Sequence, residues 1–349
     1  MNKRRIERFR AITTVGRQFT HMVYAQGKIE TALQSLKSVA SGEQQSIVSN
    51  LEAAFSEQAS SAPDALSPQI GPYSALRKLV AVVRKEGGDP IAVFPRFDAM
   101  LLSLDEHIRQ MWSSIESFLI YFLTVVIIAA IVFGELFVFV VPQYQAMFSS
   151  FGHSLPTLTD WLTKNNGIFA VLLIGGLGFV FAILIISGKR VFDNISNLLP
   201  VASFVQNIAF LKPIANSYNR ILSLNYTRVL IGAGLSFKRA LELSAQLAND
   251  EVFAAEILTS NTSGKSIAVK SKRNKQGNHV ASAIALAQAA GNLEAELDYQ
   301  ISDLNVCLAH QLMVMRDKVM TLLHVLLAVI IGLLVVAMYL PIFKLGELG

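Results

Sequence analysis

Few residues of this chain have the types and spacing that catalysis or metal binding requires. Gly264-Lys265-Ser266 resembles the end of a phosphate-binding loop, but Thr259 stands where that motif needs its first glycine. The six histidines include no pair four residues apart, and no Gly-x-Ser-x-Gly motif occurs. The sequence therefore predicts a protein that is not an enzyme and has no catalytic, cofactor-binding or metal-binding residues.

Two polar features leave alternatives open. Glu135 is the one acid within a long apolar run, where it could be a proton site or anchor a hydrogen bond between helices. A basic run lies among Asn, Ser and Gly, and its candidate contact residues are Lys270, Lys272, Arg273 and Lys275. This run could be a solvated loop, attract anionic lipid or dock to an acidic partner. No aromatic residues are interleaved for stacking, which argues against nucleic acid.

Long apolar blocks dominate the rest of the sequence. Of the 349 residues, 52% are hydrophobic and only 16% are charged, and the single Cys excludes a disulfide within the chain. The hydrophobic residues concentrate at 117–141, 168–187 and 319–341. Each block has about 20 residues or more, which is enough for a helix to cross a bilayer. We therefore predict three transmembrane helices over these ranges.

The positive charges predict how these helices are oriented. All 30 Lys and Arg residues except Lys164 and Lys344 lie in 1–117 or 188–318. Segments rich in positive charge stay on the cytoplasmic side of a membrane. The prediction places two domains, 1–116 and 188–318, in the cytoplasm. The loop 142–167 and the tail 342–349 are then on the outer side.

The two predicted cytoplasmic domains are expected to be related helical bundles. Ala, Leu, Gln, Glu, Lys and Arg dominate both, which favours helix. Phe19–Leu33 and Tyr226–Leu241 share an aromatic residue, then Gly eight residues later, then Ala-Leu. This pattern predicts a helix, a glycine cap at Gly27 or Gly234, a tight turn and a second helix.

Two long helices are predicted to run from these domains into the apolar blocks. No Pro or Gly lies between Arg96 and Ile131 or between Leu293 and Val319. The second of these stretches also carries one apolar stripe at helical spacing. Its members are Leu293, Leu297, Ile301, Leu304, Leu308, Leu312 and Met315. We expect each stretch to form an uninterrupted helix.

Several motifs resemble the inner-membrane platform family of type II secretion F proteins and type IV pilus machines. The loop after the first apolar block, VPQYQAMFSSFGHSLPTLT, carries the most specific matches, which are Pro142, Phe148, Gly152, Leu155 and Pro156. Arg228 to Leu241 resembles the repeated cytoplasmic motif of the family, and Gly291 and Pro341 match its later motifs. The chain departs from the family pattern at several positions, among them Gln288 and Tyr121. Gln288 stands where the family commonly has an acid, and Tyr121-Phe122 stands where it has Tyr-Pro.

The resemblance implies a divergent, pilus-type platform. The expected fold is an all-α membrane protein with three transmembrane helices and two related cytoplasmic helical-bundle domains. The expected location is the bacterial inner membrane, with the N-terminus cytoplasmic and the C-terminus periplasmic. Implied partners are a cytoplasmic assembly ATPase, pilin or pseudopilin subunits, other inner-membrane assembly proteins and further copies of the chain. The alternative is a small proton-coupled transporter or channel subunit that uses Glu135.

Overall fold

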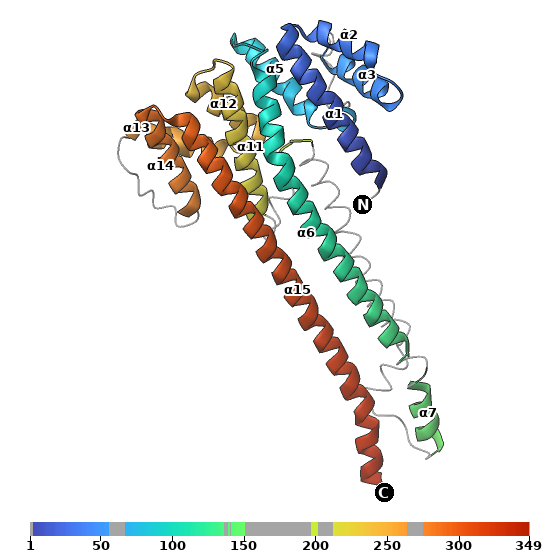
Figure 1. The fold of residues 1–349 in the computed structure, drawn as a ribbon. Coiled ribbons are helices and arrows are strands. Elements are labelled where there is room, and N and C mark those ends of the chain that lie inside the picture. Colours follow the sequence, from blue (N-terminus) through green and yellow to red (C-terminus); the bar gives the residue numbers. More distant parts are fainter. Residues whose placement is uncertain are drawn as a thin grey trace. The chain divides into compact units, whose positions relative to one another are not determined.

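The protein is mostly helical in the part that its structure, a computed structural model, describes. The described residues are 3–55, 67–135, 139, 141–150, 197–201, 212–263 and 275–348. Every regular element within these ranges is a helix, which confirms the all-α class (Figure 1). The contacts divide the chain into two compact units. Unit 1 comprises Met1–Met111 and Arg190–Leu312, and unit 2 comprises Trp112–Lys189 and Met313–Gly349.

Unit 1 consists of two halves with the same order of helices. The first half contains α1 (Lys3–Gln26), α2 (Ile29–Val39), α3 (Glu43–Phe55), α4 (Ser67–Ile70), α5 (Tyr73–Glu86) and the start of α6 (Val93–Glu135). The second half contains α11 (Lys212–Gly232), α12 (Phe237–Ala248), α13 (Glu251–Ser263), α14 (Lys275–Ala290) and the start of α15 (Leu293–Leu348). The short helix α4 has no counterpart among the described residues of the second half.

Glycines with positive φ end equivalent helices in the two halves. Gly27 after α1 has a φ of 68° and Gly234 after α11 has a φ of 95°, so both turns form where the sequence predicted them. Gly87 before α6 and Gly291 before α15 have φ values of 78° and 77°. Only glycine adopts this backbone conformation without a steric penalty. Gly87 therefore corresponds to Gly291 as Gly27 corresponds to Gly234.

Buried apolar residues repeat with the caps. Counted from their cap glycines, Val93, Phe97, Met100 and Leu104 of α6 match Leu297, Ile301, Leu304 and Leu308 of α15, and all are buried. In α1 and α11 the buried matches are Val15 with Leu222, Phe19 with Tyr226, and Val23 with Leu230. Burying a large apolar side chain contributes about 1.5–3 kcal/mol. Each half of unit 1 is therefore held together by the same helix faces.

The two long helices are uninterrupted, as the absence of Pro and Gly predicted. α6 continues from Val93 to Glu135, and α15 continues from Leu293 to Leu348. The chain therefore passes twice between unit 1 and unit 2 within a helix. Pro95 is the third residue of α6, where the backbone N–H has no partner in the helix and proline is tolerated.

The membrane spans stay a prediction from the sequence. None of the helices, as far as their residues are described, reaches the length and apolarity needed to cross a membrane. The predicted second span, 168–187, lies outside the described residues. The segment after the first predicted span begins with helix α7 (Val141–Ser150).

Candidate functional site

The two halves of unit 1 meet at a seam. It is formed by the end of α5 and the start of α6 from the first half, and by the α11–α12 turn, α12 and the start of α15 from the second. The seam residues are Glu86, Gly88, Asp89, Arg96, Gly232, Ala233, Leu235, Arg239 and Glu294. They come from distant parts of the sequence, and only folding brings them together.

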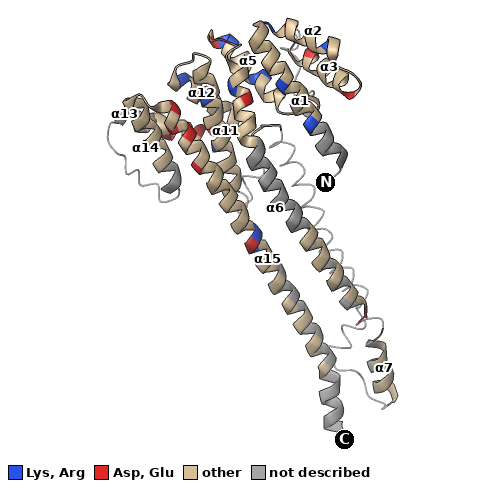
Figure 2. Ribbon diagram, in the orientation of Figure 1, with Lys and Arg blue, Asp and Glu red and all other residues tan. Residues whose placement is uncertain are grey.

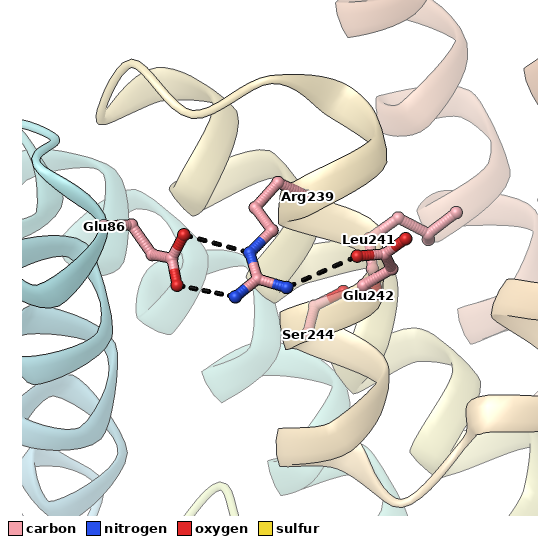
Figure 3. A network of polar contacts seen from close by, with 5 residues as sticks. All are labelled: Glu86, Arg239, Leu241, Glu242 and Ser244. Atoms are coloured by element: carbon pink, nitrogen blue, oxygen red, sulfur yellow. Dashed lines mark hydrogen bonds and ion pairs between the residues drawn. The ribbon is translucent and has the colours of Figure 1, made fainter.

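A bidentate ion pair joins α12 to the end of α5 (Figure 3). Arg239 Nε donates to Glu86 Oε2 at 2.9 Å, and Nη2 donates to Oε1 at 2.7 Å. The third nitrogen, Nη1, reaches Glu242 Oε2 on the same helix at 3.4 Å. The hydrogen bond from Arg239 is the largest cause that lowers the pKa of Glu86, so the carboxylate stays charged at neutral pH. Two parallel bonds fix the direction as well as the distance between α12 and α5.

The backbones of the two halves touch directly beside this ion pair. The N–H of Asp89 donates to the carbonyl of Ala233 at 2.9 Å. A Cβ atom on Gly88 would lie 2.7 Å from Leu235 Cδ1 and 2.8 Å from the Ala233 oxygen. Position 88 therefore requires glycine, because the second half leaves no room for a side chain there.

A second ion pair joins the starts of the two long helices. Arg96 Nη1 lies 2.8 Å from Glu294 Oε1. The hydrogen bond from Arg96 lowers the pKa of Glu294. A Cβ atom on Gly232 would lie 2.0 Å from Arg96 Nε, so this glycine makes space for the arginine. Figure 2 shows acidic residues along the first turns of α15, where Glu294 and Glu296 also face the favourable N-terminal dipole of the helix.

Equivalent residues of the two halves bind a carboxylate on their own long helix. Arg228 Nη1 lies 2.9 Å from Asp298 Oδ1 of α15. His21 is the equivalent residue of the first half, because it precedes Gly27 by as many residues as Arg228 precedes Gly234. The Nε2 atom of His21 lies 3.5 Å from Asp98 Oδ2 of α6. Asp98 is buried and also lies 3.3 Å from Arg17 Nε. The family-motif arginine thus has a structural role in the second half, and His21 takes its place in the first.

The second half also contains a charged pair with little exposure to water. Arg220 Nε lies 3.9 Å from Asp250 Oδ2, and its guanidinium lies 4.2 Å above the Phe253 ring. Burial, partly opposed by Arg220, raises the pKa of Asp250 to about 6. This carboxyl therefore loses its proton at a higher pH than an exposed aspartate does.

The predicted site residues that the structure describes are divided between unit 1 and unit 2. Gly27, Gly234 and Gly291 form turns in unit 1, and Lys275 begins α14. In unit 2, Pro142 and Phe148 lie on α7, Pro341 lies in α15, and Glu135 is the exposed last residue of α6. The others lie outside the described residues, namely Gly152, Leu155, Pro156, Lys270, Lys272 and Arg273. No group of three His, Cys, Asp or Glu side chains suited to a metal ion occurs in the described ranges.

Sequence reasoning missed the charged residues of the seam. Glu86 and Arg239 are 153 residues apart, and Arg96 and Glu294 are 198 apart. No local pattern pairs such residues. The alignment of His21 with Arg228 points only to the contacts that each half makes with its own long helix. The ion pairs and the backbone hydrogen bond of the seam hold helices of the two halves together. The fold and the site therefore define a helical scaffold built from two similar halves.

Comparison with known proteins finds similarity to two pilus assembly proteins. The chain is 26% identical over 256 residues to the type IV pilus assembly protein PilC of Pseudomonas aeruginosa, a match that covers 69% of this chain and 66% of that protein. It is 24% identical over 357 residues to the type IV pilus assembly protein TapC of Aeromonas hydrophila, covering 97% of this chain and 82% of that protein. No protein-family model and no solved structure matches. These similarities confirm the resemblance and make the chain a divergent, pilus-type relative.

Proposed function

We propose that this chain is a non-enzymatic inner-membrane platform for the assembly of type IV pili. The observation that carries the proposal is its similarity to two pilus assembly proteins, one of them along 97% of the chain. The repeated helical halves and the absence of catalytic motifs from the sequence agree with a scaffold.

The proposed topology follows the sequence. Apolar residues at 117–141, 168–187 and 319–341 form three spans, and the positive charges hold residues 1–116 and 188–318 in the cytoplasm. The loop 142–167 and the tail 342–349 are periplasmic. The loop residues Pro142, Phe148, Gly152, Leu155 and Pro156 then form an outer element that faces the pilin.

The geometry suggests how such a platform couples its two sides. A cytoplasmic assembly ATPase would push on unit 1, and the seam would make its two halves respond together. Because α6 and α15 both leave unit 1 without a helical break, they would carry displacement toward the spans. There the platform would guide pilin subunits into the fibre. A basic segment around Lys272 would contact a partner or anionic lipid, and further copies of the chain would complete the assembly.

Gene deletion tests the proposal. A strain that lacks this gene should lose surface pili and recover them when the chain is expressed again, as measured by electron microscopy and a sheared-pilus assay. Normal piliation without the gene would refute the platform role. Proton flux through proteoliposomes that is lost in Glu135→Gln would instead favour the transporter alternative.

Charge reversal at the seam tests the coupling. Glu86→Arg or Arg239→Glu should reduce piliation, and the double variant should recover part of it because the ion pair is restored in reverse. Glu52→Lys is a matched control, since its partner Lys37, at 2.8 Å, lies within the first half. All variants are compared at equal amounts of chain in the membrane. Full piliation of the single seam variants would show that the seam is not needed for assembly.

A further inference from the structure

A hydrogen bond between aromatic side chains joins the two long helices within unit 2. The Tyr121 hydroxyl of α6 lies 2.7 Å from Nε2 of His324 in α15. The centres of the two rings are 5.9 Å apart. The other ring nitrogen, His324 Nδ1, lies 2.7 Å from the carbonyl oxygen of Met320, one turn earlier in α15.

These contacts determine which tautomer a neutral His324 adopts. A carbonyl oxygen can only accept, so Nδ1 carries the hydrogen and donates it to Met320. In a neutral imidazole Nε2 then has a free lone pair and accepts the hydrogen of the Tyr121 hydroxyl. Neutral His324 therefore has both ring nitrogens satisfied. In the charged form Nε2 would be a donor, and the bond with Tyr121 in this direction would be lost.

The neighbouring polar side chains do not make such a bridge. Thr124, one turn after Tyr121, donates to the carbonyl of Ile120 in its own helix. Thr321, in the turn before His324, donates to the carbonyl of Asp317 in its own helix. Among the described residues, the Tyr121–His324 bond is the side-chain hydrogen bond that crosses between α6 and α15 in unit 2.

The sequence places the two residues at matching depth. His324 is the only Asp, Glu, Lys, Arg or His residue in 319–341, and Tyr121 lies near the start of 117–141. Each residue follows the predicted cytoplasmic end of its span by about one helical turn. A lateral bond at equal depth agrees with two parallel spans that enter the membrane from the same side. Within hydrocarbon, a hydrogen bond between side chains on neighbouring helices contributes about 0.6–2 kcal/mol.

We propose that the Tyr121–His324 pair is a register lock between α6 and α15. It fixes both the sliding and the rotation of one helix against the other at the point where both enter the membrane. Its role in pilus assembly rests on the proposed function, whereas the pairing itself does not.

An engineered metal bridge tests the pairing in the full chain. Tyr121→His would place a second imidazole beside His324 on the adjacent helix, and the ring nitrogens of two such histidines can bind one Zn²⁺ ion. In detergent, Zn²⁺ should raise the unfolding temperature of this variant by several degrees, and a chelator should reverse the shift. The wild type and the Tyr121→His, His324→Ala double variant should not respond. No Zn²⁺ response in Tyr121→His, or an equal response in the double variant, would overturn the proposal.

A double-mutant cycle supplies a second measurement that needs no new site. Tyr121→Phe keeps the ring and removes only the hydroxyl, and His324→Phe removes its acceptor. If the two residues act as a pair, the double variant should lower the unfolding temperature no further than the more damaging single variant. Strictly additive shifts would contradict the lock. If Zn²⁺ stabilises Tyr121→His but Tyr121→Phe still forms normal pili, the pairing is supported and the proposed coupling in pilus assembly is contradicted.

Discussion

Replacing Gly88 by alanine is predicted to weaken the seam through a single methyl group. The added Cβ would lie 2.7 Å from Leu235 Cδ1, 2.8 Å from the Ala233 oxygen and 2.9 Å from Val83 Cγ1. Leu235 has a flexible tip that can turn away, but the Ala233 oxygen belongs to the backbone. The two halves must therefore separate locally, and the adjacent bond from the Asp89 N–H to the Ala233 carbonyl stretches or breaks.

The expected magnitude follows from two contributions. Inserting a methyl group into a packed contact costs about 1–3 kcal/mol. Losing one hydrogen bond costs about 0.5–1.5 kcal/mol more. We therefore expect Gly88→Ala to destabilise the chain by about 2–4 kcal/mol.

The neighbouring glycine provides the control. Gly87 has a φ of 78° and no atom within 4 Å of the position of a Cβ, so Gly87→Ala adds only backbone strain of about 1–2 kcal/mol. Denaturant unfolding of both variants in detergent measures the difference. Adding Leu235→Ala to Gly88→Ala should recover part of the loss, because it removes one of the close contacts. A Gly88→Ala variant as stable as the wild type would refute the argument that the halves are in tight contact here.

Three further changes test other parts of unit 1. The pKa of Asp250 is raised from 3.8 to about 6, so the folded chain binds this proton more tightly than the unfolded chain does. The contribution of Asp250 to the free energy of unfolding therefore falls as the pH rises from about 4 to 6. Thermal unfolding across this pH range should show that slope in the wild type and lose it in Asp250→Asn. Gly16→Ala should destabilise the first half by about 1–3 kcal/mol, since its Cβ would lie 1.9 Å from the Tyr73 ring. In the same unfolding assay, Gly16→Ala should cost much less stability when it is made in a Tyr73→Leu background. Gly234→Val should cost about 1–3 kcal/mol from backbone strain alone, because nothing lies within 4 Å of its Cβ position, and Gly234→Asn should cost less in denaturant unfolding.

Local patterns predicted the elements of unit 1 well. Gly27 and Gly234 form the expected turns, because positive φ is a property of the residue itself and needs no distant partner. The stripe along α15 is buried at Leu297, Ile301 and Leu304, because helical periodicity alone determines which residues share a face.

The partners of the polar residues were not predictable in this way. Arg228 was identified through a motif, but its partner Asp298 was not, and the corresponding contact of His21 with Asp98 was missed. Nothing in the sequence pairs Tyr121 with His324, which are 203 residues apart, and their hydrogen bond depends on how α6 and α15 pack together. The local sequence around a side chain does not indicate which distant helix will pack beside it.

The sequence by itself determined the helices, the glycine turns and the relationship of the two halves, since each depends on residues close together along the chain. The tertiary structure alone decided the seam. Glu86 meets Arg239 across 153 residues, and Gly88 is constrained by a backbone carbonyl that its own neighbours do not supply. The physical reason is that ion pairs and close backbone contacts depend on how preformed helices dock, and docking is set by the shapes of whole faces rather than by any short run of residues.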